Sequence, residues 1–303
     1  MEDLPRPVLT LRALAAASVL VPALLLAAFA WLSWRGAWAD AELRAERQSA
    51  AMAEHLRAVL QVHALSVTRV AARLAPGNPD PVGRGEPLHG LLARFVADSP
   101  DLVAIVATDA SGRAVAANSG HPPPDLDLSD RDYFRALRDG QDLAVGAPVL
   151  GRLTGRRTWP VARRVEAGNG GFGGVVTSAV PLEAVAAFFT GLGDGGGRSL
   201  TVARGDGTVL LRLPEANTGV ATLSPDGGFL RAVAANPGGG TYRTVSELDR
   251  VDRLHVVRPV PGHDIHASVG VDLAAIRAAW LREAGPAALA AALGAGALLS
   301  LTL

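Results

Sequence analysis

The chain has 303 residues, of which 49% are hydrophobic, 19% charged and 5% aromatic, and this composition excludes a disordered polar chain. There is no cysteine, so disulfides, thiolate catalysis and cysteine metal sites are excluded. The 29 basic residues, all of them arginine, balance 29 acidic residues, so the chain has no general positive field that would attract nucleic acid.

The first expected element is a transmembrane helix over residues 13–34, a run of 22 residues without a charged side chain. At about 1.5 Å per residue the run would reach roughly 33 Å, enough to span a bilayer. Arg6 and Arg12 precede it, which favours a cytoplasmic location for residues 1–12. The alternative is a signal peptide cleaved after Ala39, but the run exceeds the roughly 7–15 residues of a typical signal core.

A second apolar run, residues 284–303, is just long enough to form another transmembrane helix. With two spans in the inner cell membrane, residues 35–283 would lie on the extracytoplasmic, periplasmic side. The chain stops inside this run without a polar flank, which indicates that the natural protein continues beyond Leu303. The alternative is a C-terminal tail anchor.

Between the two runs, residues 36–75 are expected to form one long helix. Residues 37–74 contain no proline or glycine and are rich in alanine, leucine, glutamate and arginine, all good helix formers. Such a helix would extend about 57 Å from the membrane. Its apolar residues recur at spacings of three, four or seven, and they are Leu43, Ala50, Ala53, Leu60, Val67 and Leu74. This stripe could pack against a globular domain, a second protomer, or both.

The following region repeats one order of elements and is expected to form two tandem α+β modules with antiparallel sheets, at residues 100–190 and 198–272. Each module opens with strand, turn and strand, and Asp206-Gly207 is a strong tight-turn signal in the second. The other expected elements are a helix at 129–138 capped by Ser129 or Asp130, strands at 144–150, 158–166 and 175–180, a helix at 182–189, strands at 255–259 and 265–271, and an exit helix at 273–283.

A long helix, two small sheets and an exit helix together resemble the double-Cache, or tandem PAS-like, sensor domains of bacterial histidine kinases, diguanylate cyclases and chemoreceptors. The most specific local match is Ser129-Asp130-Arg131-Asp132-Tyr133-Phe134-Arg135, which resembles the S-D-R-D-Y-F-R helix of the family. Further matches follow in order, at Val145-Gly146-x-Pro148, Gly155, Arg163-Arg164, Gly171–Val176, Asp206-Gly207, Leu210, Pro214 and Arg258–Gly262. The resemblance covers about residues 36–283.

This resemblance implies that the first, membrane-distal module binds the ligand between its sheet and its short helix. By position, Arg131 would bind an anionic group, and Tyr133 and Phe134 would line the cavity. An arginine fork suits a carboxylate, because two parallel charge-assisted hydrogen bonds can form. The alternative for Tyr133 and Phe134 is that they are core residues of the module.

Three strand residues complete the expected ligand site. Trp159 and Arg163 share one face of their strand and would both face the pocket, and Ser178 lies on the last strand of the module. The alternative for Trp159 is again a place in the core.

The ligand is expected to be a small anion, and an organic acid is favoured over an amino acid. The amino-acid-binding version of the family carries an aspartate on the last strand for the ligand ammonium, and Ala179 stands there in this chain. Residues 131–164 also contain eight arginines against three acids. For three of these arginines we favour a solvated hairpin face instead, namely Arg152, Arg156 and Arg157.

No residue pattern indicates a catalytic site, a metal site or a bound cofactor. His263 and His266 are three apart, which on a strand puts them on opposite faces. The resemblance implies the input domain of a homodimeric receptor whose output, a histidine kinase or a diguanylate cyclase, lies outside this chain. The alternatives are a two-anchor periplasmic binding or scaffold protein without catalytic output, and a periplasmic enzyme whose catalytic residues the sequence does not reveal.

Overall fold

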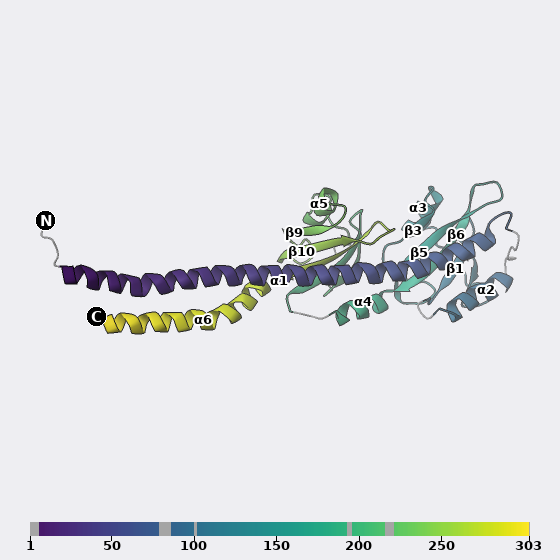
Figure 1. Cartoon of the computed structure of the whole chain (residues 1–303). Coiled ribbons are helices and arrows are strands. Elements are labelled where there is room, and N and C mark those ends of the chain that lie inside the picture. Colours follow the sequence, from purple (N-terminus) through teal and green to yellow (C-terminus); the bar gives the residue numbers. More distant parts are fainter. Residues whose placement is uncertain (1–5, 79–85, 100–101, 193–195, 216–220, 303) are drawn as a thin grey trace.

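The structure is a computed structural model that describes residues 6–78, 86–99, 102–192, 196–215 and 221–302. It consists of a very long first helix, two antiparallel sheets beside the C-terminal half of that helix, and a last helix that runs back along its N-terminal half (Figure 1). Residues 1–5 of the expected cytoplasmic segment and Leu303 lie outside the described residues.

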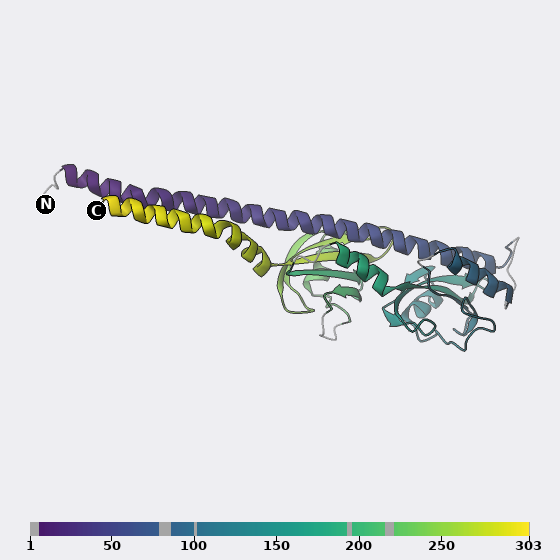
Figure 2. The ribbon, with the colours of Figure 1, turned by 90° about the horizontal axis from the view of Figure 1, so that it is seen from below.

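Helix α1, Arg6–Leu74, joins the expected transmembrane run and the long helix into one element of 69 residues. It contains Pro22, and it ends where the chain reaches the proline- and glycine-rich stretch after Leu74. Among the described residues, one helix is long and apolar enough to cross a membrane, with its candidate span inside Val19–Leu74. Figure 2 shows α1 passing along one side of both sheets.

The first sheet has six strands in the order β2-β1-β6-β5-β3, with β4 paired to the end of β5. Helix α2, Glu86–Ala97, precedes the sheet, α3, Asp132–Arg138, lies between β2 and β3, and α4, Leu182–Gly191, follows β6. The strands are β1 Ile105–Thr108, β2 Ala114–Ala117, β3 Leu143–Val145, β4 Val149–Leu150, β5 Arg157–Glu166 and β6 Phe172–Pro181.

The second sheet has five strands in the order β8-β7-β11-β10-β9. Helix α5, Gly228–Ala235, lies between β8 and β9 in the chain. The strands are β7 Arg198–Arg204, β8 Val209–Leu213, β9 Gly240–Val245, β10 Asp252–Pro259 and β11 Ile265–Asp272. The two sheets fit two PAS-like modules, as the sequence predicted, and the second lies nearer to both ends of the chain than the first (Figure 1).

The main core forms where α1 packs against both sheets, and its largest buried α1 side chains include Met52, Leu56 and Leu60. The expected stripe is only partly right, because Ala53, Leu60 and Val67 are buried whereas Leu43 and Ala50 are exposed. A spacing pattern read from alanine and leucine alone mixes two neighbouring faces of a helix that is rich in both.

Several local expectations differ from the structure. Helix α3 begins at Asp132 with Arg131 as its N-cap residue, so the expected cap at Ser129 or Asp130 is wrong. The Asp130 carboxylate instead binds Arg152. The expected strand at 144–150 is split into β3 and β4, and Gly146 lies between them. A Cβ on Gly146 would lie 2.7 Å from the Tyr133 ring, so glycine at this position lets the chain between β3 and β4 pack against α3.

The last helix, α6, covers Leu273–Thr302 and joins the expected exit helix to the second apolar run. It lies beside α1 (Figure 2), and the Trp280 indole N–H donates to Ser33 Oγ at 2.8 Å. The Trp280 ring also meets Trp34 edge-on at 5.6 Å. A second membrane span in α6 stays a prediction.

Candidate functional site

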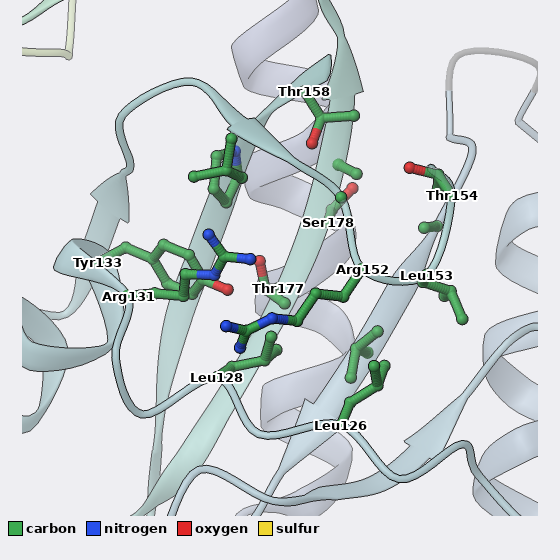
Figure 3. A pocket seen from close by; sticks show the side chains of 16 residues that line it. Leu126, Leu128, Arg131, Tyr133, Arg152, Leu153, Thr154, Thr158, Thr177 and Ser178 are labelled. Carbon is green, nitrogen blue, oxygen red and sulfur yellow. The ribbon is translucent and has the colours of Figure 1, made fainter. Parts of the chain in front are cut away.

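A small cavity of about 60 Å³ lies on the first sheet, on the face opposite α1. Figure 3 shows side chains from the sheet, from the segment leading into α3 and from the loop after β4 converging on it. Its lining residues are Ala104, Val106, Leu126, Leu128, Arg131, Tyr133, Val149, Gly151, Arg152, Leu153, Thr154, Thr158, Pro160, Thr177, Ser178 and Ala179.

Strand alternation explains which residues reach the cavity. Side chains alternate between the two faces of a sheet, so Thr158 and Pro160 of β5 face the cavity while Trp159 and Val161 face α1. On β6, Val176 and Val180 join the α1 core, which leaves Thr177 toward the cavity. The sheet thus separates the cavity from α1 by a single layer of backbone.

Arg131 supplies the more weakly paired positive charge of the site. Its side chain is 17% exposed, and its Nε lies 3.8 Å from Asp130 Oδ1, which is beyond hydrogen-bonding distance. The other cavity arginine, Arg152, is bound in a fork to Asp130, with Nη1 to Oδ1 at 3.0 Å and Nη2 to Oδ2 at 2.8 Å. A ligand anion would therefore find the Arg131 guanidinium, rather than that of Arg152, ready to donate.

Tyr133 and Thr177 add two buried hydroxyls beside Arg131. Burial raises the pKa of Tyr133 to about 12, and the nearby Thr177 side chain acts in the opposite direction. The phenol therefore stays protonated and can donate a hydrogen bond at physiological pH. Thr177 is 7% exposed, and its Oγ1 lies close to the Tyr133 hydroxyl without meeting the geometric criteria of a hydrogen bond within the described residues. A buried hydroxyl in this state is a ready partner for a polar ligand.

The structure brings three of the six residues expected from sequence to the cavity, namely Arg131, Tyr133 and Ser178. The Ser178 hydroxyl nevertheless points to the α1 face, where Oγ lies 2.6 Å from His63 Nδ1. Phe134 does not line the cavity. It is packed with Leu137 and meets Phe172 edge-on at 5.3 Å.

Trp159 and Arg163 also lie away from the cavity. They do share a face of β5, as expected, but it is the face toward α1. The Trp159 indole N–H donates to the Leu210 carbonyl of the second module at 2.9 Å. Trp159 therefore joins the two modules, and the core alternative describes its position.

Sequence reasoning missed Arg152, which it assigned to a solvated hairpin, and the hydroxyls of Thr158 and Thr177. Strand alternation offered a signal for the threonines, since Thr158 and Thr177 each stand next to a large apolar residue, Trp159 and Val176, that packs toward α1. Arg152 gives no local signal, because its partner Asp130 is 22 residues away in the chain.

Two larger hollows lie between the modules. One of about 530 Å³ is lined by residues that include Asp132, Tyr133, Arg204 and His263, and another of about 500 Å³ lies between α4 and β8. Within the ranges that the structure describes, no group of three or more histidine or acidic residues is placed to hold a metal ion.

Comparisons with known proteins agree with this architecture. The sequence matches no family model, and no curated protein matches it. An extracellular domain assigned to a histidine kinase, rpHK1S-Z16, is 26% identical, with a TM-score of 0.66 over 79% of this chain and 97% of that one. The ligand-binding domain of the Pseudomonas aeruginosa chemoreceptor PctB, in complex with L-Gln, has a TM-score of 0.58 at 19% identity, over 82% of this chain and 98% of that one.

A third similar structure is the Campylobacter jejuni chemoreceptor Tlp3 domain with L-valine, which has a TM-score of 0.54 at 11% identity, over 81% of this chain and 98% of that one. The chain thus has the fold of extracellular Cache-type sensor domains of histidine kinases and chemoreceptors. The expected preference for an organic acid finds no support here, because the ligands named for these chemoreceptor domains are amino acids.

Proposed function

We propose that this chain is the extracytoplasmic sensory input domain of a bacterial receptor and that the cavity beside α3 is its ligand site. The observation that carries the proposal is the convergence of the Arg131 guanidinium with two buried hydroxyls on the face of the sheet opposite α1. The same α1 contains the candidate membrane span, so one helix connects the sensing module to the membrane.

The ligand that fits this site is a small molecule with a carboxylate. Arg131 can donate two parallel hydrogen bonds to it, and the Tyr133 and Thr177 hydroxyls can bind its other polar atoms. Amino acids are the first class to test, since they are bound in similar domains. Among the described residues no carboxylate lines the cavity, so an amino acid's ammonium would be held by neutral oxygens, among them the Thr154 and Thr158 hydroxyls.

Ligand binding would act on the membrane segments through the helix pair α1 and α6. A ligand shifts a two-state equilibrium only by its differential affinity for the two states, and helix displacements of about 1–2 Å suffice in known switches. A second copy of the chain would supply the reference against which α1 moves. A histidine kinase or a diguanylate cyclase is the output that we propose for the receptor.

The test is ligand binding to the full chain in lipid nanodiscs. Each of the twenty amino acids is compared with its deaminated analogue by thermal shift, and the strongest is then measured by calorimetry. Arg131→Ala should weaken its binding by at least about tenfold, because a charge-assisted hydrogen bond contributes about 1.5–3 kcal/mol.

The matched control is Arg138→Ala, on the same helix but with its exposed side chain paired to Asp139 and absent from the cavity lining. It should change affinity less than twofold. A ligand that binds the Arg131→Ala chain as tightly as the unmodified chain would overturn the site.

A further inference from the structure

The second sheet repeats the strand order of the first, and the register matches where the first hairpin of each module meets its last strand. In the first sheet Val106 of β1 pairs with Thr177 of β6, and in the second Thr201 of β7 pairs with Ser268 of β11. The first hairpin of each module also carries its register shift at the same place, two residues after Val106 and after Thr201 respectively. Ser268 is therefore the counterpart of Thr177, the hydroxyl that faces the first cavity.

Each of these two hydroxyls has a buried tyrosine beside it. Tyr133 lies near Thr177, and Tyr242 of β9 lies near Ser268. Burial raises the pKa of Tyr242 well above its usual value, and the contact with the Ser268 hydroxyl acts in the opposite direction. The two hydroxyls lie close together, but they do not meet the geometric criteria of a hydrogen bond. The two tyrosines come from different elements, α3 and β9, so the shared arrangement is a property of the site and not of one repeated motif.

A second cavity, of about 30 Å³, lies at Ser268. It is formed by the α5-facing side of the second sheet together with Phe229 of α5 and the segment after β9. Its lining residues are Thr201, Arg212, Leu223, Phe229, Tyr242, Thr244, Ser246, Glu247, Leu248, His255 and Ser268.

Three buried polar atoms of this lining have no hydrogen-bond partner among the described residues. They are Ser268 Oγ, His255 Nε2 and Arg212 Nε, in residues that are 1%, 7% and 7% exposed. More than nine in ten buried polar groups in proteins have a partner, and leaving one without a partner costs about 1–3 kcal/mol. Three such atoms on one small cavity indicate that something polar completes them.

We propose that the second module carries its own ligand site, for a carboxylate of the size of formate or acetate. The donors suit this class. Arg212 gives Nη1 to Thr201 and Nη2 to Asp249, which leaves its Nε–H for a ligand. Ser268 and Tyr242 can donate their hydroxyl hydrogens, and neutral His255 can donate from Nε2.

The surrounding charged groups pair with one another and do not occupy these donors. Asp249 also accepts from Arg253, which in turn binds Asp272, so two guanidiniums and two carboxylates balance. Glu247, the acid among the lining residues, accepts the Ser224 backbone N–H with its carboxylate at 2.8 Å. The directed hydrogen-bond donors, and not a net positive field, therefore select the ligand. The volume, half that of the first cavity, restricts it to a few heavy atoms.

The experiment measures thermal stability and calorimetric binding of sodium formate and sodium acetate to the full chain in nanodiscs, against sodium chloride at equal ionic strength. The unmodified chain should bind at least one of the two carboxylates. Ser268→Ala should weaken this binding at least fivefold, and it should slightly raise the melting temperature without ligand because it removes a buried unpaired hydroxyl.

Ser199→Ala is the matched control. Ser199 also has a buried Oγ without a partner among the described residues, but it does not line the cavity. Its replacement should raise the melting temperature similarly and leave formate and acetate binding unchanged. Arg131→Ala should also leave this binding unchanged, which keeps failure of the first site distinct from failure of the second.

Two results would overturn the proposal. If neither carboxylate binds better than chloride, the cavity holds water only. If binding is undiminished in Ser268→Ala, the carboxylate does not occupy the second module, and its loss in Arg131→Ala would place it in the first.

Discussion

Arg204 Nη1 in the second module donates to Asp132 Oδ2 in the first module at 2.9 Å. Asp132, the first residue of α3, stands between Arg131 and Tyr133, which both line the first cavity. Its carboxylate also accepts the backbone N–H groups of Tyr133 and Ala147. A ligand that draws Arg131 or Tyr133 inward therefore also moves a carboxylate that the second module holds, which gives the modules a direct connection.

We expect the Asp132–Arg204 pair to couple the two modules in stability. A double-mutant cycle with Asp132→Asn and Arg204→Gln, read by denaturant titration in nanodiscs, should give a coupling free energy of about 1 kcal/mol. The figure is modest because both side chains are partly exposed, at 22% and 35%, and water screens them. The same cycle on the more exposed pair Arg243 and Asp252 should give a smaller coupling free energy. Equal coupling in both cycles would contradict a special role for Asp132.

Trp159 makes the second connection between the modules, and its replacement should lower stability without changing ligand affinity. Trp159→Phe keeps a ring in the core but loses the hydrogen bond to the Leu210 carbonyl, so the free energy of unfolding should fall by about 1–3 kcal/mol. Affinity for the first-module ligand should change less than twofold, because the indole faces α1. Trp31→Phe, on an exposed part of α1, is the control for tryptophan loss. A large loss of affinity in Trp159→Phe would instead show that Trp159 contributes to the ligand site.

The order of elements could be predicted from local signals, and the direction of β5 side chains could not. Proline and glycine mark the ends of α1 and the hairpin turns, and alternation correctly put Trp159 and Arg163 on one face. Both faces of β5 are buried through its middle, so apolarity does not distinguish the cavity face from the α1 face. The α1 face of β5 is set only by the packing of α1, a helix more than 80 residues away in the chain.

Other misses have two physical origins, weak local signals and long-range contacts. Helix α5 is short, with Gly227 as its N-cap and Gly228 as its first residue, and β9 is never fully buried, so neither gives a strong periodic signal. The fork between Arg152 and Asp130 and the contact between His63 and Ser178 join residues far apart in sequence. Charge counting could place arginines near the site but could not say which one an acid neutralises.

His255 should make the protein less stable in mild acid. Burial, together with the nearby Arg212 and Arg253 guanidiniums, lowers the pKa of His255 to about 4. In the unfolded chain the value is about 6.5, so between about pH 6.5 and 4 the unfolded state binds the proton more readily. The buried neutral His255 therefore costs no stability above about pH 6.5. As the pH falls toward 4, the free energy of unfolding falls by about 3 kcal/mol in total because of this histidine.

The measurement is the free energy of unfolding between pH 7 and 4 for the unmodified chain and for His255→Gln. The variant should show a shallower decline, and the exposed His121→Gln should follow the unmodified chain. Burial lowers the pKa of His263 and His266 as well, so part of the decline should persist in His255→Gln. An identical slope in His255→Gln and the unmodified chain would show that this histidine is not the group responsible.

Ser178 connects the back of the ligand site to α1, and it should affect stability more than ligand affinity. Its hydroxyl lies 2.6 Å from His63 Nδ1, in the otherwise apolar layer between the first sheet and α1. Ser178→Ala should lower the free energy of unfolding by about 1–3 kcal/mol, because a buried ring nitrogen loses this partner. Ligand affinity should stay within about twofold of the unmodified chain, since the side chain that Ser178 loses points away from the cavity. Thr177→Val, one residue earlier on the same strand, should show the reverse, with weaker binding and little loss of stability. If both variants lost affinity equally, strand alternation would not divide β6 into a ligand face and a helix face, and Ser178 would be a ligand contact after all.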